Sequence, residues 1–196
     1  MIKNKIAIDI VLLFPDEINK LLYTLNSKII PEEGMEHYII DGVACFPHIS
    51  LLMGITEAEN IDFIKEKLFK IAQRYLPLNI RFTHIQNVKF PYLAIKPEDN
   101  LINFQKEIAR EIKLDYDANK NMFVNSNISD AGVEWVNEYK KNNIEKYNLH
   151  TTIGLGDVSM IRDVEFPIDI ELCNLAITQL GVYCSCRKIL AEVNLL

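Results

Sequence analysis

Two short segments of the chain combine a histidine, a hydroxyl side chain and a glycine at the same spacing. The first is His48-Ile49-Ser50, followed by Gly54, and the second is His150-Thr151-Thr152, followed by Gly156. One segment lies in each half of the 196-residue chain. The repetition predicts a duplicated unit in which each half contributes to a composite site.

The residues around both motifs are apolar and partly β-branched, which is typical of β-strands. Residues two apart on a strand point to the same face. His48 should therefore lie beside Ser50, and His150 beside Thr152. Gly54 and Gly156 should mark either the end of each strand or a close approach of two backbones.

Two histidines that face each other across a groove can perform acid–base catalysis. The ordinary pKa of histidine lies near neutrality, so one imidazole can accept a proton while the other donates one. The adjacent hydroxyls can donate to non-bridging phosphoryl oxygens. We therefore predict that His48 and His150 are catalytic, in an order left open, and that Ser50 and Thr152 bind phosphate in a phosphodiester cleavage or transesterification that needs no metal.

The paired motifs resemble those of the 2H phosphoesterase superfamily, which includes the 2′-5′ RNA ligase-like proteins and cyclic nucleotide phosphodiesterases. The resemblance rests on His48 and Ser50, then His150 and Thr152, with Ser50 at a position where threonine is common. It implies an α+β fold in which residues 1–196 form a single domain of two pseudo-symmetric lobes, each with one motif. It also implies metal-independent cleavage of a cyclic or 2′-linked nucleotide or oligonucleotide phosphodiester.

The net charge and the hydropathy of the chain limit which partners it is expected to bind. The net charge of −6 argues against binding of long duplex nucleic acid, which requires many phosphate contacts. A nucleotide or a short oligonucleotide needs only a local cluster of donors and is the expected substrate. No apolar run is long enough to span a bilayer, so no membrane partner is expected. The apolar N-terminal stretch is interrupted by Asp9, which favours a strand over a signal peptide.

The four cysteines, Cys45, Cys173, Cys184 and Cys186, do not form a metal-binding pattern. We expect the four cysteines to be buried free thiols of a protein in a reducing compartment. Cys184 and Cys186 should lie on the same face of one strand. We therefore predict a cytoplasmic protein without a cofactor or metal. The sequence does not indicate an oligomeric state.

Periodicity predicts α+β architecture, with mainly antiparallel sheets along a central groove and helices packed outside. A Thr56/Glu59 capping box should open the second helix, and 115–130 is polar enough to be mobile. The expected strands are 5–14, 78–82, 85–90, 92–95, 168–182 and 189–193, besides the two motif strands; the expected helices are 15–26, a helix ending at Tyr75, 97–113 and 131–140.

Other residues are candidates for substrate contact. Tyr183, Arg187 and Lys188 lie on or beside the turn of the last predicted hairpin, where an aromatic ring could stack on a base and a cation could meet phosphate. Phe46, just before the first motif, and Tyr92 could also stack on a base, although core packing is the simpler account. His37 and His84 lack a hydroxyl two residues later and are expected to be surface and structural histidines.

Three alternatives remain at this stage. The same site could support RNA end-processing or a 2′-5′ ligase-type transesterification. A non-catalytic nucleotide-binding module on the same fold is the second. The third is a metal-dependent hydrolase that combines a histidine with carboxylates such as Asp130 or Asp157, although these do not form a spaced ligand cluster.

Overall fold

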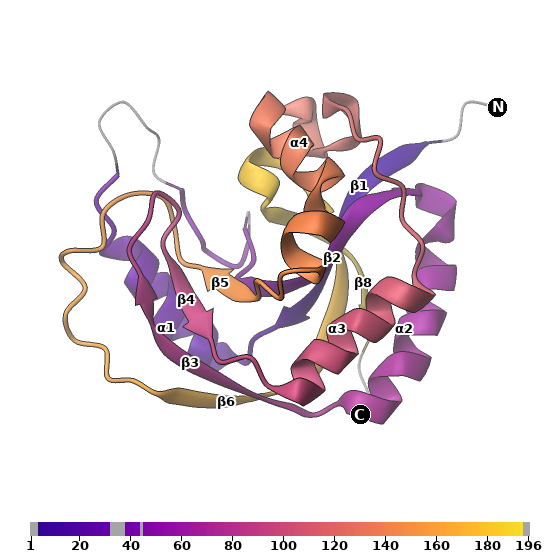
Figure 1. The fold of residues 1–196 in the computed structure, drawn as a ribbon. Helices are drawn as coiled ribbons and strands as arrows, with labels where there is room; N and C mark the ends of the chain where they lie inside the picture. Colours follow the sequence, from indigo (N-terminus) through magenta and orange to yellow (C-terminus); the bar gives the residue numbers. More distant parts are fainter. Residues whose placement is uncertain (1–3, 32–37, 44, 194–196) are drawn as a thin grey trace.

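The computed structural model describes residues 4–31, 38–43 and 45–193; His37 therefore lies outside the described residues. Two four-stranded antiparallel sheets dominate the fold, with the orders β2-β1-β7-β8 and β5-β4-β3-β6 (Figure 1). The α+β prediction is confirmed. The strands are β1 Lys5–Leu13, β2 His48–Glu57, β3 Leu78–Gln86, β4 Tyr92–Ile95, β5 His150–Thr152, β6 Ile168–Leu172, β7 Asn174–Leu180 and β8 Cys186–Val193.

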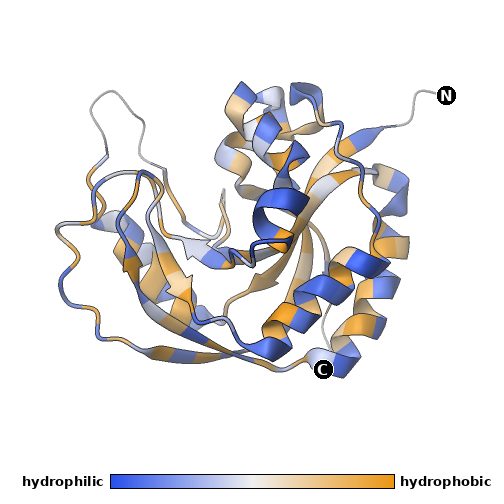
Figure 2. Cartoon of the chain, viewed as in Figure 1, coloured by the Kyte–Doolittle hydropathy of each residue, from blue (hydrophilic) through white to orange (hydrophobic). Residues whose placement is uncertain are grey.

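Amphipathic helices cover the sheets. Helix α2 packs on β7 and β8, and α3 contacts α2, β2 and β3, with polar residues on the outer faces of both helices (Figure 2). None of the helices within the described ranges is long and apolar enough to cross a membrane. The helices are α1 Asp16–Ser27, α2 Ile61–Tyr75, α3 Asp99–Glu111 and α4 Asp130–Asn137, with the π-helix η4 Lys140–Ile144 and the 3-10 turns η1 Ala58–Asn60, η2 Lys120–Met122, η3 Val124–Ser126 and η5 Val182–Cys184.

The two motif strands lie at corresponding places in the two sheets. Strand β2 is the edge strand of the first sheet, β5 is the edge strand of the second, and the two strands contact each other. The sheets do not follow the halves of the sequence, because the C-terminal strands β7 and β8 complete the first sheet beside β1. The fold therefore brings one histidine motif from each sheet to a shared boundary.

Two local predictions at the first motif strand were incomplete. Thr56 does not cap a helix, because it lies in β2 and pairs there with Ile6 of β1. Helix α2 begins only at Ile61, after η1. Pairing along a whole strand outweighed a local capping pattern. Gly54 does not end its strand either, but it does mark a close approach, because a side chain there would clash with Leu114.

The predicted strand boundaries at the C-terminal end were also wrong. The expected strand 168–182 is divided at Cys173, where the chain leaves β6 in the second sheet and enters β7 in the first. Residues 78–86 form one strand in place of two. Cys184 does not share a strand face with Cys186, because it lies in η5 with a left-handed backbone (φ 57°). All of these outcomes depend on pairing between distant segments, which a local pattern does not encode.

The segment 115–130 is attached to the first lobe at several points. The backbones of Ile55 and Asp115 exchange two hydrogen bonds, of 2.8 and 2.9 Å, and the side chains of Phe123 and Ile128 are buried in the main core. Polar composition predicted mobility here, but a few apolar anchors between the polar residues fix the path of the backbone.

Candidate active site

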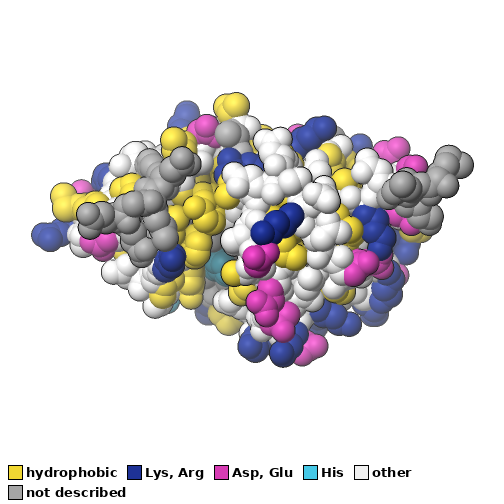
Figure 3. All heavy atoms as spheres, turned by 90° about the horizontal axis from the view of Figure 1, so that it is seen from above, with side chains coloured by type: hydrophobic (Ala, Val, Ile, Leu, Met, Phe, Trp, Pro, Cys, Tyr) yellow, Lys and Arg dark blue, Asp and Glu magenta, His cyan; other side chains and the backbone are white. Residues whose placement is uncertain are grey.

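A cavity of about 400 Å³ lies between the two motif strands. His48 and Ser50 line it from β2, and His150 and Thr152 line it from β5. Figure 3 shows a histidine at the bottom of a hollow bordered by hydrophobic side chains. The structure therefore brings together the four residues that the repeated motif singled out.

Both imidazoles are held in the same way. His48 Nδ1 lies 2.7 Å from the carbonyl oxygen of Phe46, and His150 Nδ1 lies 3.0 Å from that of Asn148, in each case two residues earlier in the chain. A carbonyl oxygen only accepts hydrogen bonds, so each Nδ1 carries a proton and donates. Nε2 is left in each ring as the nitrogen available for proton exchange with a substrate.

The two histidines differ in their electrostatic environment. Burial lowers the pKa of His48 to about 4, against the favourable hydrogen bond to Phe46, and the nearby His150 lowers it further. Burial also lowers the pKa of His150, with its hydrogen bond to Asn148 acting in the opposite direction. Both rings are therefore biased towards the neutral form, and the bias on His48 is the larger.

A buried carboxyl group lies behind the first motif. The Ser50 hydroxyl donates to Asp9 Oδ2 over 2.6 Å, and the Asp9 side chain is completely buried. A register shift between β1 and β2 at Ile10/Val11 places an extra residue in β2, a bulge of the kind that re-aims side chains near active sites. Burial raises the pKa of Asp9 well above its ordinary value. In the sequence, Asp9 stands out only as a polar interruption in a strand, and no local pattern indicates this contact.

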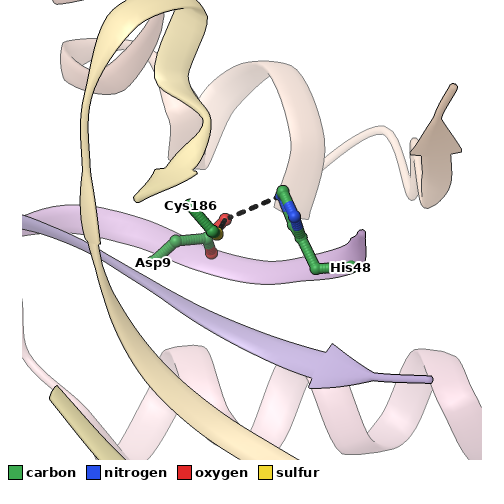
Figure 4. A group of neighbouring side chains, drawn as sticks. All are labelled: Asp9, His48 and Cys186. Atoms are coloured by element: carbon green, nitrogen blue, oxygen red, sulfur yellow. Dashed lines mark hydrogen bonds and ion pairs between the residues drawn. The ribbon is translucent and has the colours of Figure 1, made fainter. Parts of the chain in front are cut away.

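Asp9, His48 and Cys186 form a group of metal-ligand type within the described residues, with ligand atoms within 4.8 Å of one another (Figure 4). His48 Nε2 lies 3.8 Å and Cys186 Sγ 4.0 Å from Asp9 Oδ2. A carboxylate, an imidazole and a thiolate would suit Zn²⁺. However, Asp9 Oδ2 already accepts from Ser50, and Cys186 Sγ accepts from the Thr178 hydroxyl over 2.9 Å. An ion would have to displace these hydrogen bonds.

The carboxylates named in the metal-dependent alternative lie elsewhere. Asp130 pairs with Lys120 over 2.8 Å, and the Asp157 carboxylate accepts hydrogen bonds from Ser159. Neither carboxylate lines the cavity. The arrangement therefore gives no support to a metal site built from these two groups.

Several aromatic side chains line the rest of the cavity wall. Tyr183, one of the predicted contact residues, reaches it from η5, where its backbone is left-handed (φ 57°). Its ring contacts those of Tyr38 and Phe90, with centroids 5.6 and 5.8 Å away. Tyr92 lies 4.6 Å from the His150 ring, and Trp135 lines the cavity from α4. Such a wall suits a flat heterocyclic ring.

The predicted contact residues Phe46, Arg187 and Lys188 do not line the cavity. Phe46 packs in a small apolar cluster with Val11 and Cys186, and its carbonyl oxygen holds His48. Arg187 lies over the Tyr38 ring at 6.0 Å, one layer behind the wall, and Lys188 is exposed on β8. The positions of Phe46, Arg187 and Lys188 therefore do not support a direct contact between these side chains and a substrate in the cavity.

Two further residues escaped the sequence analysis. Asn143, in the π-helix η4, borders the cavity. Asn26, buried in α1, donates to the carbonyl oxygens of Tyr38 and Ile153 over 2.8 and 2.9 Å, which ties the cavity wall to the segment after β5. An isolated asparagine in a helical pattern carries no signal that would reveal either role. His84 is exposed on β3 and bonds Thr83 and Gln86, away from the cavity.

Comparison with known proteins shows a shared fold. No protein-family model matches the sequence, and no curated protein matches it. Among solved structures, E. coli LigT complexed with NADP⁺ matches with a TM-score of 0.57 at 13% identity, covering 98% of both chains. TT0787 of Thermus thermophilus matches with a TM-score of 0.57 at 13% identity over 97% of this chain and 98% of that one. A structure described as a phosphoesterase matches with a TM-score of 0.51 at 15% identity over 96% and 97%.

Proposed function

We propose that this chain is a metal-independent phosphodiesterase that cleaves a cyclic or 2′-linked nucleotide phosphodiester. The observation that carries the proposal is the matched presentation of His48 and His150. Each ring is fixed through Nδ1 by the carbonyl two residues earlier, and both line one cavity from facing edge strands. Two fixed imidazoles on one cavity suit general acid–base catalysis at a shared phosphorus.

The electrostatic difference between the two histidines supports a division of roles. His48, with a pKa of about 4, is neutral at pH 7 and acts as the base. Its Nε2 accepts a proton from the attacking water as the water oxygen bonds to phosphorus. The bond from phosphorus to one ribose oxygen breaks, and His150 Nε2 gives that oxygen its proton. A bound phosphodiester anion favours the imidazolium that this second role needs, and Thr152 donates to a non-bridging oxygen.

The charge of the cavity supports a diester substrate. None of its lining residues, within the described part of the chain, is a lysine, arginine, aspartate or glutamate. A phosphodiester carries one negative charge, whereas a phosphomonoester carries up to two near neutral pH. Without a fixed cation, burying the second charge is costly. The cavity should therefore bind a diester and release the monoester product.

The structural neighbours support a nucleotide substrate. E. coli LigT has been crystallised with NADP⁺, with 3′-AMP and with ATP. The aromatic wall offers stacking surfaces to a base beside the two histidines, and stacking contributes about 1–3 kcal/mol per base. The resemblance of the paired motifs to the 2H phosphoesterases points to 2′,3′-cyclic or 2′-5′ linkages.

The test is an assay of the purified protein, in excess chelator, against 2′,3′-cyclic nucleotides and against 2′-5′ and 3′-5′ dinucleotides. We expect turnover of a cyclic or 2′-linked substrate, with products assigned by regiochemistry. The His48→Ala/His150→Ala double variant, purified in parallel, controls for contaminating enzymes. Nucleotide binding without any product in the whole panel would replace the enzyme by a binding module.

A further inference from the structure

The hydroxyl of the first motif is engaged in a hydrogen bond, whereas the hydroxyl of the second is not, within the described ranges. A phosphate-binding hydroxyl must donate its single proton to a phosphoryl oxygen. The Ser50 proton is directed away from the substrate, because the hydroxyl donates to Asp9 Oδ2 over 2.6 Å. Among the described residues no hydrogen bond occupies the Thr152 hydroxyl, so that group is free to donate into the cavity.

We propose that Asp9 is a positioning residue that is held as a neutral carboxylic acid and donates its proton to Ser50, so that Ser50 donates to the substrate. A protonated carboxyl can reverse the 2.6 Å contact: its O–H donates, and Ser50 Oγ accepts. The Ser50 proton then becomes available to a phosphoryl oxygen. The inference rests on the proposed function for its substrate, but the protonation of Asp9 can be measured without one.

The surroundings of Asp9 favour the neutral acid. Its side chain is fully buried, and Oδ1 has no hydrogen-bond partner within the described residues. A buried carboxylate would need several donors or a cation. In the part of the chain that the structure describes, the only basic group in ion-pair range is His48, whose Nε2 lies 3.8 Å from Oδ2.

The other groups that face Asp9 do not provide a positive charge. Cys186 on β8 and Cys184 in η5 are thiols, and Tyr139 is a phenol. Burial raises the pKa of each of them, so they stay neutral as well. On β7, the Thr178 hydroxyl lies 2.9 Å from Cys186 Sγ and 3.3 Å from the backbone carbonyl oxygen of Asp9, and it has no hydrogen bond to the carboxyl group. The described elements packed around Asp9 therefore leave its carboxyl without charge compensation.

A neutral Asp9 also preserves the role of His48. A carboxylate 3.8 Å from Nε2 would stabilise the imidazolium and weaken the neutral ring needed as a base. A carboxylic acid exerts no such attraction. The same proton therefore frees the Ser50 donor and keeps His48 neutral.

The direct test is infrared spectroscopy of the whole protein. We expect the difference spectrum between the wild type and Asp9→Asn to contain the carbonyl stretch of a protonated carboxylic acid at neutral pH. Asp163→Asn, an exposed carboxyl change, should not remove this band. A carboxylate band in its place would overturn the proposal, whether or not any substrate is cleaved.

The kinetic test uses the conservative variant. Asp9→Leu should lower kcat by about tenfold or more, because Ser50 loses the hydrogen bond that directs its proton towards the phosphoryl oxygen. Asp9→Asn should recover most of that loss, because its amide can donate to Ser50 as the acid does. In the Ser50→Ala background the two substitutions should have equal kcat. Equal loss in both Asp9 variants with Ser50 present, in proteins whose folding is confirmed by circular dichroism, would contradict the donor role.

Discussion

The two motifs have the same backbone geometry but different surroundings. His48 and His150 are each fixed by the carbonyl two residues earlier, on edge strands of two sheets. Behind Ser50 lies the buried Asp9 carboxyl, whereas no described carboxyl group bonds the Thr152 hydroxyl. The first histidine also has the larger downward shift in pKa.

This difference shows how a repeated motif can supply two unlike chemical groups. The strand geometry that places an imidazole beside a hydroxyl is common to both sheets. The protonation state is set by what packs behind each strand, which the motif itself does not specify. A base and an acid can thus be built from the same local pattern, as general acid–base catalysis requires.

Removal of either imidazole should cause the largest loss of activity. His48→Ala and His150→Ala should each lower kcat by about 10²–10⁴-fold, because each removes one proton-transfer group. His84→Ala, exposed on β3, is the matched control and should retain full turnover. The measurement is steady-state cleavage of the best substrate from the panel, and wild-type turnover in either active-site variant would refute the paired mechanism.

The sequence predicted this pair because its signal is local. A histidine, a hydroxyl two residues later and apolar flanks determine which face each side chain occupies on a strand. The amphipathic helices α2 and α3 were found for the same reason, since their apolar spacing is written within one segment. Local periodicity was enough to predict the α+β class and the four motif residues at the cavity.

What the sequence did not reveal depends on contacts between distant segments. Asp9 meets Ser50 only because β1 pairs with β2 across a register shift. Tyr38, Phe90 and Trp135 reach one cavity from three separate segments, and their spacing carries no common pattern. Arg187 and Lys188 were predicted from a turn that η5 and β8 arrange differently.

The histidines can be compared through stability as well as rate. The pKa of His48 falls from 6.5 to about 4 on folding, so between these values the unfolded state binds more protons. His48 therefore contributes a rise in stability with pH across this window of about 3 kcal/mol. A neutral Asp9 acts in the opposite direction, because its raised pKa lets the folded state hold that proton. His48→Gln should remove most of that rise and His150→Gln a smaller part. Urea unfolding at a series of pH values measures both, and equal slopes in the two variants would remove the proposed asymmetry.

Removing each hydroxyl in turn also tests the difference between the two motifs, with smaller expected effects. Ser50→Ala and Thr152→Ala should each lower kcat by about 10²-fold, the loss of one oxyanion donor. Only Ser50→Ala should also lower the free energy of unfolding, by about 1–3 kcal/mol, because it leaves the buried Asp9 carboxyl without its partner. Chemical denaturation separates the two effects, and an equal stability loss in Thr152→Ala would contradict the assignment.

Removal of metal ions should have the smallest effect on kcat. The Asp9, His48 and Cys186 group has ligand types that suit Zn²⁺, and the second motif has no counterpart within the described residues. Its acceptors already hold hydrogen bonds from Ser50 and Thr178, so an ion would have to compete with them. Treatment with a strong chelator followed by desalting should leave kcat unchanged in the wild type and in Cys186→Ser. The opposite outcome would be a loss of turnover after chelation that added Zn²⁺ restores in the wild type but not in Cys186→Ser. The first motif would then be a metal site, and only His150 of the two motif histidines would remain free for acid–base catalysis.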